Sequence, residues 1–189
     1  REFHVLLSTI SLPNRRYALE CGSLNVTVQK TLTIHQKWKH YRGGFEDTVY
    51  VHFPLDTYRL LRKLKPDIIL SFELGFRSFA CTLYRICHPS CRLILCTFMS
   101  THTEQGRGLI RSRLRKWLVR RADAITYNGP ECLDVLRSIG VSRDKLFQFG
   151  YAAHPIFINN EPLKRSALIE RRLLYIGQIS ERKGVAQMM

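Results

Sequence analysis

The chain has 189 residues, enough for one α/β domain or for one domain and part of another. With 45% hydrophobic and 24% charged residues, its composition is globular and excludes a disordered tail or a fibrous repeat. Thirty Lys and Arg against fifteen Asp and Glu give a net charge of +15, which favours an anionic partner such as nucleic acid, phospholipid head groups or a phosphorylated small molecule.

No targeting or membrane-spanning segment is recognisable. No apolar run approaches the ~20 residues that a spanning helix needs, and no signal-peptide pattern follows the first four residues. We therefore expect a cytoplasmic protein, with peripheral attachment to the inner face of the membrane as a further option. Because the chain begins with Arg1 rather than Met, we also expect it to be part of a longer protein.

The six cysteines do not form the pattern of a disulfide framework. Only Cys87-His88-Pro89-Ser90-Cys91 is clustered, and a zinc site would need a second ligand pair, which does not follow. We predict buried free thiols, a turn at Pro89 and Ser90, and no bound metal.

In chain order, short apolar runs alternate with helical stripes, the pattern of βαβ units. Strands are predicted at residues 3–10, within 24–34 as one or two strands, and at 48–53. Asp56 is the predicted N-cap of a helix that ends before Pro66.

The second half continues the alternation. Residues 67–70 carry no polar alternation, so they are predicted to form a strand that is buried on both faces. A helix with apolar residues at Ile110, Leu114, Trp117 and Leu118 follows later. The remaining predictions are helices at 76–87, 109–121 and from Pro130 to Gly140, and strands at 92–98, 124–127 and 147–149.

The predicted fold is a Rossmann-like parallel sheet flanked by helices over residues 1–150. Residues 151–169 contain two prolines and two asparagines without a helical period, so they are predicted to be a linker. Residues 170–189 restart with a strand and the beginning of a helix, which we interpret as the start of a second Rossmann-like domain.

Four segments, in this order, resemble one enzyme family. Residues 64–69 (Leu-Lys-Pro-Asp-Ile-Ile), 121–125 (Arg-Ala-Asp-Ala-Ile), 132–141 and 175–184 (Tyr-Ile-Gly-Gln-Ile-Ser-Glu-Arg-Lys-Gly) resemble the retaining family 4 (group 1) glycosyltransferases of the GT-B fold. The resemblance covers about residues 50–189. No Gly-rich turn of the family's first βα unit is recognisable before or after residue 3.

The resemblance implies two Rossmann-like domains facing a cleft, with the acceptor on the first and a nucleotide-sugar donor on the second. It implies metal-independent transfer of a sugar, with retention, to a polysaccharide, lipid-linked or other glycan precursor, without a cofactor. The family's pair of glutamates would lie beyond residue 189, so these residues alone are expected to be inactive.

For the donor diphosphate, the resemblance implies a site on the loop that opens the second domain. Gly177 and Gly184 would let the backbone approach, Gln178 would donate a hydrogen bond, and Lys183 would neutralise the departing diphosphate. The alternative is that Arg182 and Lys183 form a solvated basic turn.

Polar loops after two predicted strands supply the remaining candidates, because open α/β sheets bind ligands at the carboxyl ends of their strands. The resemblance matches His102 to a cleft histidine of the family, which makes it the candidate catalytic residue, with Thr103 and Glu104 beside it on the acceptor side. The alternative is a loop histidine that pairs with Glu104 or Arg107.

After the strand at 67–70, the acceptor-side candidates are Glu73, Gly75, Phe76 and Arg77. Gly75 allows close approach of a ligand, and Glu73 and Arg77 offer a carboxylate and a guanidinium. The alternative is an ordinary loop at a helix N-terminus with Arg77 exposed.

The helix at 109–121 is basic and amphipathic, which is typical of a surface that binds an anionic membrane. Alternatively, its apolar side covers the sheet and its basic side is solvated. The candidate surface consists of Arg111, Arg113, Arg115, Lys116, Trp117 and Arg120, with Trp117 at the membrane boundary.

Two further readings compete with an enzyme. The charge of +15 favours a nucleic-acid-binding α/β module, but no recognition motif accompanies it, so nucleic acid is not the expected partner. The second alternative is a non-catalytic scaffold that resembles a glycosyltransferase, because a protein can keep the fold of an enzyme without its activity.

Overall fold

A computed structural model describes residues 2–11, 22–39, 46–104, 108–150 and 185. The chain divides into two compact units, Arg1–Gln36 with Thr48–Gly150, and Lys37–Asp47 with Tyr151–Met189. The predicted linker and second-domain start lie outside the described residues, apart from the helical Val185, so their boundaries stay predictions.

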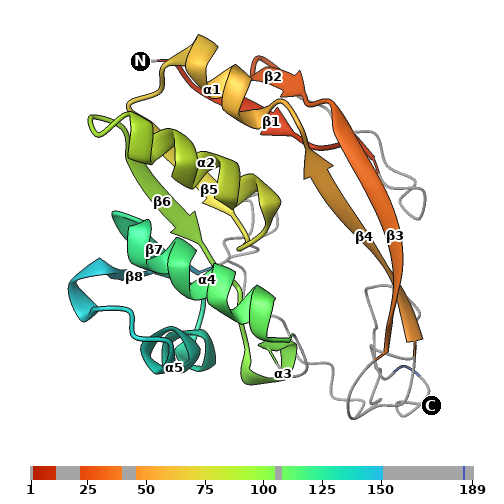
Figure 1. The fold of residues 1–189 in the computed structure, drawn as a ribbon, viewed down its shortest axis with the longest axis vertical. Coiled ribbons are helices and arrows are strands. Elements are labelled where there is room, and N and C mark those ends of the chain that lie inside the picture. Colours follow the sequence, from red (N-terminus) through yellow and green to blue (C-terminus); the bar gives the residue numbers. More distant parts are fainter. Residues whose placement is uncertain (1, 12–21, 40–45, 105–107, 151–184, 186–189) are drawn as a thin grey trace, which may run out of the picture. The chain divides into compact units, whose positions relative to one another are not determined.

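Four strands come first, and from residue 57 to residue 148 helices and strands alternate, as predicted; Figure 1 shows their arrangement. None of the helices in the described part of the chain is both long and apolar enough to cross a bilayer. The elements are β1 (His4–Leu7), β2 (Asn25–Val28), β3 (Thr31–Lys39), β4 (Glu46–Pro54), α1 (Thr57–Leu64), β5 (Ile68–Phe72), α2 (Phe76–Cys87), β6 (Arg92–Cys96), α3 (Thr101–Glu104), α4 (Leu109–Arg121), β7 (Ala124–Tyr127), α5 (Pro130–Ser138), a 3₁₀ turn (Arg143–Lys145) and β8 (Leu146–Gln148).

The centre of the first unit is a four-stranded parallel sheet in the order β5-β6-β7-β8, which confirms the α/β class and is compatible with a Rossmann-like fold. β1 and β2 form a separate parallel pair, and β3 pairs with β4. Successive strands of the central sheet are connected by helices, and each new strand is added on the same side of the previous one. Right-handed connections of this kind place their helices on one face, and Figure 1 shows α2 and α4 crossing the same face.

This one-sided topology corrects the prediction that the strand at 67–70 is buried on both faces. In β5 the side chains of Ile69 and Ser71 are buried, whereas those of Ile68 and Leu70 are 59% and 51% exposed. Successive residues of a strand point to opposite faces, so the second pair lies on the face that no connecting helix covers. On that face Phe147 of β8 is also exposed.

The core lies between the sheet and the helices. Leu93 and Leu95 of β6 and Ile125 of β7 are completely buried, and Leu118 of α4 and Leu136 of α5 are buried against them. The apolar stripes of the sequence predict these contacts correctly, except at the first turn of α4, where Ile110 is exposed.

The beginning of α1 is held differently from the prediction. Asp56 occupies the N-cap position but makes no side-chain hydrogen bond to the helix. Its Oδ1 instead accepts a hydrogen bond from the backbone N–H of Lys30 at 3.1 Å. Thr57 donates from its hydroxyl to the Pro54 carbonyl at 3.2 Å and accepts from Gln29 Nε2 at 2.7 Å. The residues between β2 and β3 therefore fix this end of α1.

Five cysteines in the described residues are free thiols. Cys81, Cys91, Cys96 and Cys132 are buried as predicted, but Cys87 at the end of α2 is exposed, which corrects the prediction for that position. The predicted turn at Pro89 and Ser90 is present.

One carboxylate joins α2, β6 and the start of β7. Arg85 donates from Nε and Nη2 to Asp123 at 3.1 and 3.0 Å, and Arg92 donates from Nη1 at 3.1 Å. The backbone N–H of Leu93 adds a fourth bond at 2.9 Å. The hydrogen bonds from Arg85, together with those from Leu93 and Arg92, hold the pKa of the Asp123 carboxyl well below its usual range.

Replacing this carboxylate should destabilise the unit. We expect Asp123→Asn to lower the free energy of unfolding by about 2 kcal/mol, because charge-assisted hydrogen bonds to Arg85 are lost. A group with a depressed pKa stabilises the fold above its ordinary pKa of about 4, and that contribution declines as the pH falls below it.

Urea unfolding at pH 7 and at about pH 3 measures both effects. Arg92→Gln is the matched control, because the Arg92 side chain is 65% exposed and its ion pair should contribute under about 1 kcal/mol. An equal loss in both variants, or a loss that does not shrink in acid, would contradict the assignment.

Candidate functional site

The carboxyl ends of β5 and β6 place two polar loops side by side. The N–H of Glu73, the first residue after β5, donates to the carbonyl of Cys96 at the end of β6 at 3.0 Å. Glu73 begins one loop, and Thr97–Ser100 with α3 forms the other. This is the edge of a parallel sheet at which ligands of α/β proteins bind.

Glu73 has a φ of +68°, in the left-handed region that favours glycine. Its carbonyl accepts a hydrogen bond from Ser78 Oγ, and the Ser78 and Ser71 hydroxyls lie 2.9 Å apart. The side chain of Glu73 is exposed. The first turn of α2 therefore holds this strained backbone and leaves its carboxylate in solvent.

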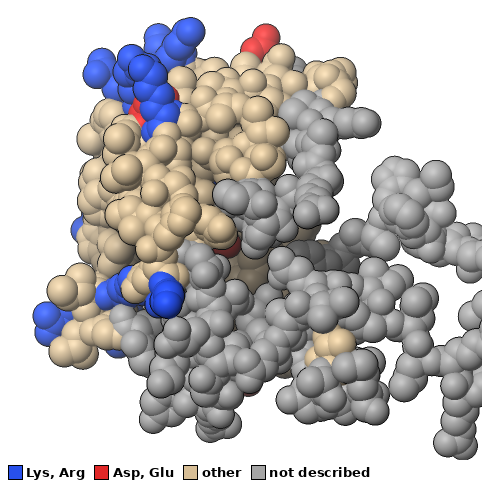
Figure 2. Space-filling view, turned by 90° about the vertical axis from the view of Figure 1, so that its right-hand side faces the viewer, with Lys and Arg blue, Asp and Glu red and all other residues tan. Residues whose placement is uncertain are grey.

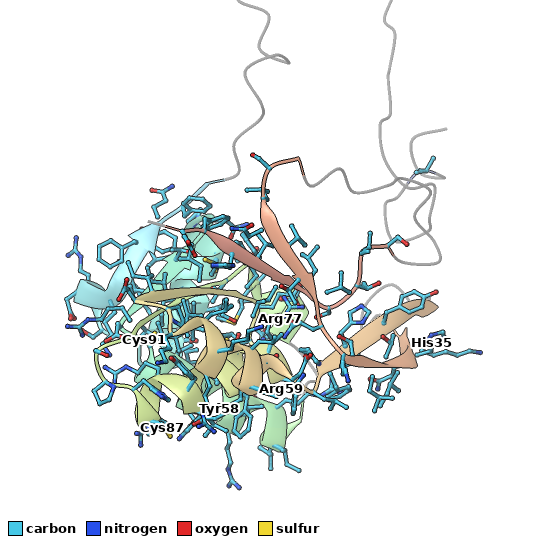
Figure 3. All side chains as sticks on the ribbon, turned by 90° about the horizontal axis from the view of Figure 1, so that it is seen from above. His35, Tyr58, Arg59, Arg77, Cys87 and Cys91 are labelled. Carbon is cyan, nitrogen blue, oxygen red and sulfur yellow. The ribbon has the colours of Figure 1, made fainter. Side chains whose placement is uncertain are left out.

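Arg77 lies in the first turn of α2 and is half-buried, which contradicts the alternative in which it is exposed. Its Nη2 donates to Ser8 Oγ beyond the end of β1, and its buried Nε has no hydrogen-bond partner among the described residues. No side chain caps α2 at Gly75, and its first turn contains no acidic residue. The helix dipole and Arg77 therefore both favour negative charge here. Figure 3 shows Arg77 and Cys87 at opposite ends of α2.

His52 on β4 joins this group, although the sequence analysis did not single it out. Burial lowers its pKa first, the positive charge of Arg77 lowers it further, and the carboxylate of Glu73 opposes both. Its Nδ1 lies 3.0 Å from the hydroxyl of Thr33. The imidazole is therefore neutral near pH 7 and able both to donate and to accept a hydrogen bond.

Aromatic rings lie beside these polar groups. Phe76 contacts Phe53 edge to face, with 5.5 Å between ring centroids, and Phe72 stacks on Phe98 at 6.4 Å. Phe72 and Phe76 are 47% and 37% exposed. Partly exposed aromatic rings beside a carboxylate, an imidazole and a guanidinium suit a ligand with hydroxyl groups on an apolar ring.

The loop after β6 is fixed through α3. Thr101 donates from its N–H and its hydroxyl to Glu131 Oε1 at 3.2 and 2.6 Å. The hydroxyl of Thr103 lies 2.9 Å from the N–H of Ser100, and Glu104 forms an ion pair with Arg115. The side chain of His102 lies outside the described residues, so its catalytic role stays a prediction.

A cavity of about 380 Å³ lies between α3, α4 and α5. This volume is in the range of small-molecule sites. Its lining is partly polar and partly apolar and consists of Met99, Thr101, Glu104, Ser112, Arg115, Lys116, Val135, Ser138 and Ile139. Glu104 is the one predicted acceptor-side residue among them.

A cysteine nucleophile is not available beside Arg77. Burial raises the pKa of Cys81 to about 11, although a hydrogen bond with Ser71 and the charge of Arg77 oppose it. The thiol is therefore protonated at neutral pH and acts as a small apolar side chain.

The predicted donor-diphosphate residues are not tested by the structure. Gly177, Gln178, Lys183 and Gly184 lie outside the described residues. Among the basic residues of α4, Arg115 is wrongly predicted to be exposed, because its side chain is 14% exposed and is paired with Glu104.

Trp117, predicted at a membrane boundary, is partly buried and contacts another helix. Its ring lies 5.7 Å from that of Phe79 on α2, and the Arg121 guanidinium lies 5.9 Å from it. The tryptophan belongs to the contact between α2 and α4. The exposed apolar residues of α4 are Leu109 and Ile110 instead.

The sequence analysis also missed a basic surface on α1. Figure 2 shows Lys and Arg side chains gathered at the top of the molecule, where α1 lies in Figure 1. Arg59, Arg62, Lys63 and Lys65 are all exposed, and their spacing over seven residues could have indicated it. A cavity of about 350 Å³ beside Arg62 and Lys65 lies at the opposite edge of the sheet from Glu73.

No family model matches the chain, and no curated protein matches it.

The strained conformation of Glu73 predicts an unusual response to glycine. We expect Glu73→Gly to be more stable than Glu73→Ala by about 1 kcal/mol, because both lack the carboxylate but only glycine, which has no Cβ, adopts a φ of +68° without strain. Urea unfolding of the two variants measures the difference. Equal stabilities would show that the backbone is not strained.

The electrostatic coupling around His52 predicts opposite shifts in two variants. Arg77→Gln should raise the pKa of His52 toward its ordinary value, because a nearby positive charge is removed, and Glu73→Gln should lower it further. An NMR titration of the imidazole carbon resonances measures both shifts, with Arg59→Gln on α1 as control. Shifts of the same sign in both variants would contradict the arrangement.

Proposed function

We propose that this chain carries the acceptor-side domain of a glycosyltransferase that transfers a sugar from a nucleotide-sugar donor to a glycan or lipid-linked acceptor. The observation that carries the proposal is the convergence of Glu73, Arg77 and His52, with exposed aromatic rings, at the carboxyl end of a parallel sheet. The resemblance of residues 64–69, 121–125, 132–141 and 175–184 supports the same reaction class and the GT-B arrangement.

On the acceptor side, hydrogen bonds would orient the attacking hydroxyl. Arg77 reaches this edge with an unpaired buried Nε, and a ligand oxygen there would satisfy it. Glu73 would accept from a sugar hydroxyl, and the neutral imidazole of His52 would exchange hydrogen bonds with another. Phe76 would pack on the apolar face of the sugar ring.

The chemical step needs stabilisation of the leaving nucleoside diphosphate, whose negative charge grows in the transition state. In the proposal Lys183 supplies positive charge without a metal ion, and Gln178 with the backbone at Gly177 and Gly184 donates hydrogen bonds. His102 contacts the donor sugar or the acceptor. These roles, and retention of stereochemistry, come from the resemblance.

The test uses the longer protein that also carries the family's pair of glutamates, because residues 1–189 alone are expected to be inactive, and it follows release of nucleoside diphosphate from a panel of UDP-, GDP-, ADP- and dTDP-sugars. Lys183→Ala should lower kcat on the order of 100-fold, because the developing charge loses its counter-charge. Arg77→Gln should mainly raise the acceptor KM, by about tenfold, because one charge-assisted hydrogen bond is lost.

Arg59→Gln, which removes an exposed cation of α1 that is not among the charges acting on His52, is the control and should change neither constant. Absence of nucleoside diphosphate release with every donor, together with absence of donor binding, would overturn the proposal in favour of a non-catalytic scaffold. Unchanged kinetics in Lys183→Ala would overturn the role given to that residue.

A further inference from the structure

The outer side of α4 combines exposed apolar and basic side chains. We propose that this surface docks on an anionic phospholipid bilayer, with Leu109 and Ile110 inserted at the boundary between head groups and acyl chains and Arg113, Lys116 and Arg120 bound to lipid phosphates. The inference stands on the residues of α4 and does not depend on the proposed function.

The apolar part lies in the first turn of the helix. Leu109 is 76% exposed and Ile110 is 84% exposed, more than any other large apolar side chain in the described ranges. Complete burial of a side chain of this kind is worth about 1.5–3 kcal/mol. Two adjacent residues of this exposure at a helix end form a compact apolar projection.

The basic part follows on the same side of the helix. Leu109, Arg113, Lys116 and Arg120 recur at intervals of four, three and four residues, so they form one row along α4. All of them are exposed, and α4 contains no acidic residue. Among the described residues, no carboxylate forms an ion pair with Arg113, Lys116 or Arg120.

The opposite side of α4 packs against the protein interior. Leu118 and Val119 are buried, and Arg115 is paired with Glu104. The periodicity of apolar residues alone does not show whether one side of a helix faces the core or a membrane. The contacts of Leu118, Val119 and Arg115 show which side of α4 faces the core. The inner side holds the helix on the sheet, which leaves the outer row available to a partner.

The chemistry of the row favours a bilayer over nucleic acid. Unpaired cations suit the phosphates of either partner. Leu109 and Ile110 gain from burial at the boundary between head groups and acyl chains, whereas nucleic-acid surfaces engage cations and stacking aromatic rings. The helix N-terminus also adds positive potential beside these two residues, since no acidic residue or side-chain cap neutralises it.

Flotation with vesicles tests the docking. We expect the protein to bind vesicles of phosphatidylcholine containing about one-third phosphatidylglycerol, and to bind pure phosphatidylcholine much more weakly. Arg113→Gln with Lys116→Gln should lower the partition coefficient about 25-fold, at about fivefold for each charge. Ile110→Ser should lower it about tenfold, and this loss should persist at high salt, where the effect of the charges fades.

Matched controls lie on and beside α1. Arg59→Gln with Lys63→Gln removes the same two charge types from another exposed helix, and Leu55→Ser removes an apolar side chain that is 68% exposed. These variants should bind as the unaltered protein does. Equal losses in the controls, or absence of binding to anionic vesicles, would overturn the proposal. Salt-sensitive RNA binding that depends on Arg113 and Lys116 but not on Ile110 would also overturn it, in favour of a nucleic-acid surface.

Discussion

The carboxylate of Asp123 connects the helical layer to the sheet at the amino ends of its strands. It accepts hydrogen bonds from Arg85 at the end of α2 and from the backbone and side chains at the start of β6. The relative register of α2, β6 and β7 is therefore fixed at one edge. The opposite edge carries Glu73, whose N–H bonds to the end of β6, and Arg77, which lies in the first turn of α2. A single, partly buried carboxylate thus joins these elements at the edge of the sheet opposite the candidate site.

The order of strands and helices could be predicted from the sequence because periodicity reports which residues are apolar on each element. β5 shows the limit of that inference. Its unbroken apolar run predicts that helices cover both faces of the strand. Which faces are covered depends on where the connecting helices lie, and in the order β5-β6-β7-β8 every connection crosses the sheet in the same direction and leaves its helices on one face. Asp56 shows the same limit on a smaller scale, because its partner is the backbone of Lys30, far away in sequence.

The candidate site was predictable only where it is continuous in the chain. Glu73, Gly75, Phe76 and Arg77 follow one strand, so the rule for carboxyl ends of strands found them. His52 and Ser8 come from β4 and from the end of β1, and no local pattern connects them to α2. In α4, Arg115 was included in the predicted membrane-binding surface only because it is charged. Its side chain is instead mostly buried and forms an ion pair with Glu104. Such partners are set by the fold and not by spacing.

The uncovered side of β5 makes mutational tolerance change from one residue to the next. Ile69 and Leu70 are similar in size and hydropathy, yet the first is 7% exposed and the second 51% exposed. A polar replacement at Ile69 would place an unsatisfied group among Leu93 and Leu95, whereas at Leu70 it would meet water. A substitution matrix that scores residue types would treat the two positions alike, although the same polar replacement should destabilise the fold much more at Ile69 than at Leu70.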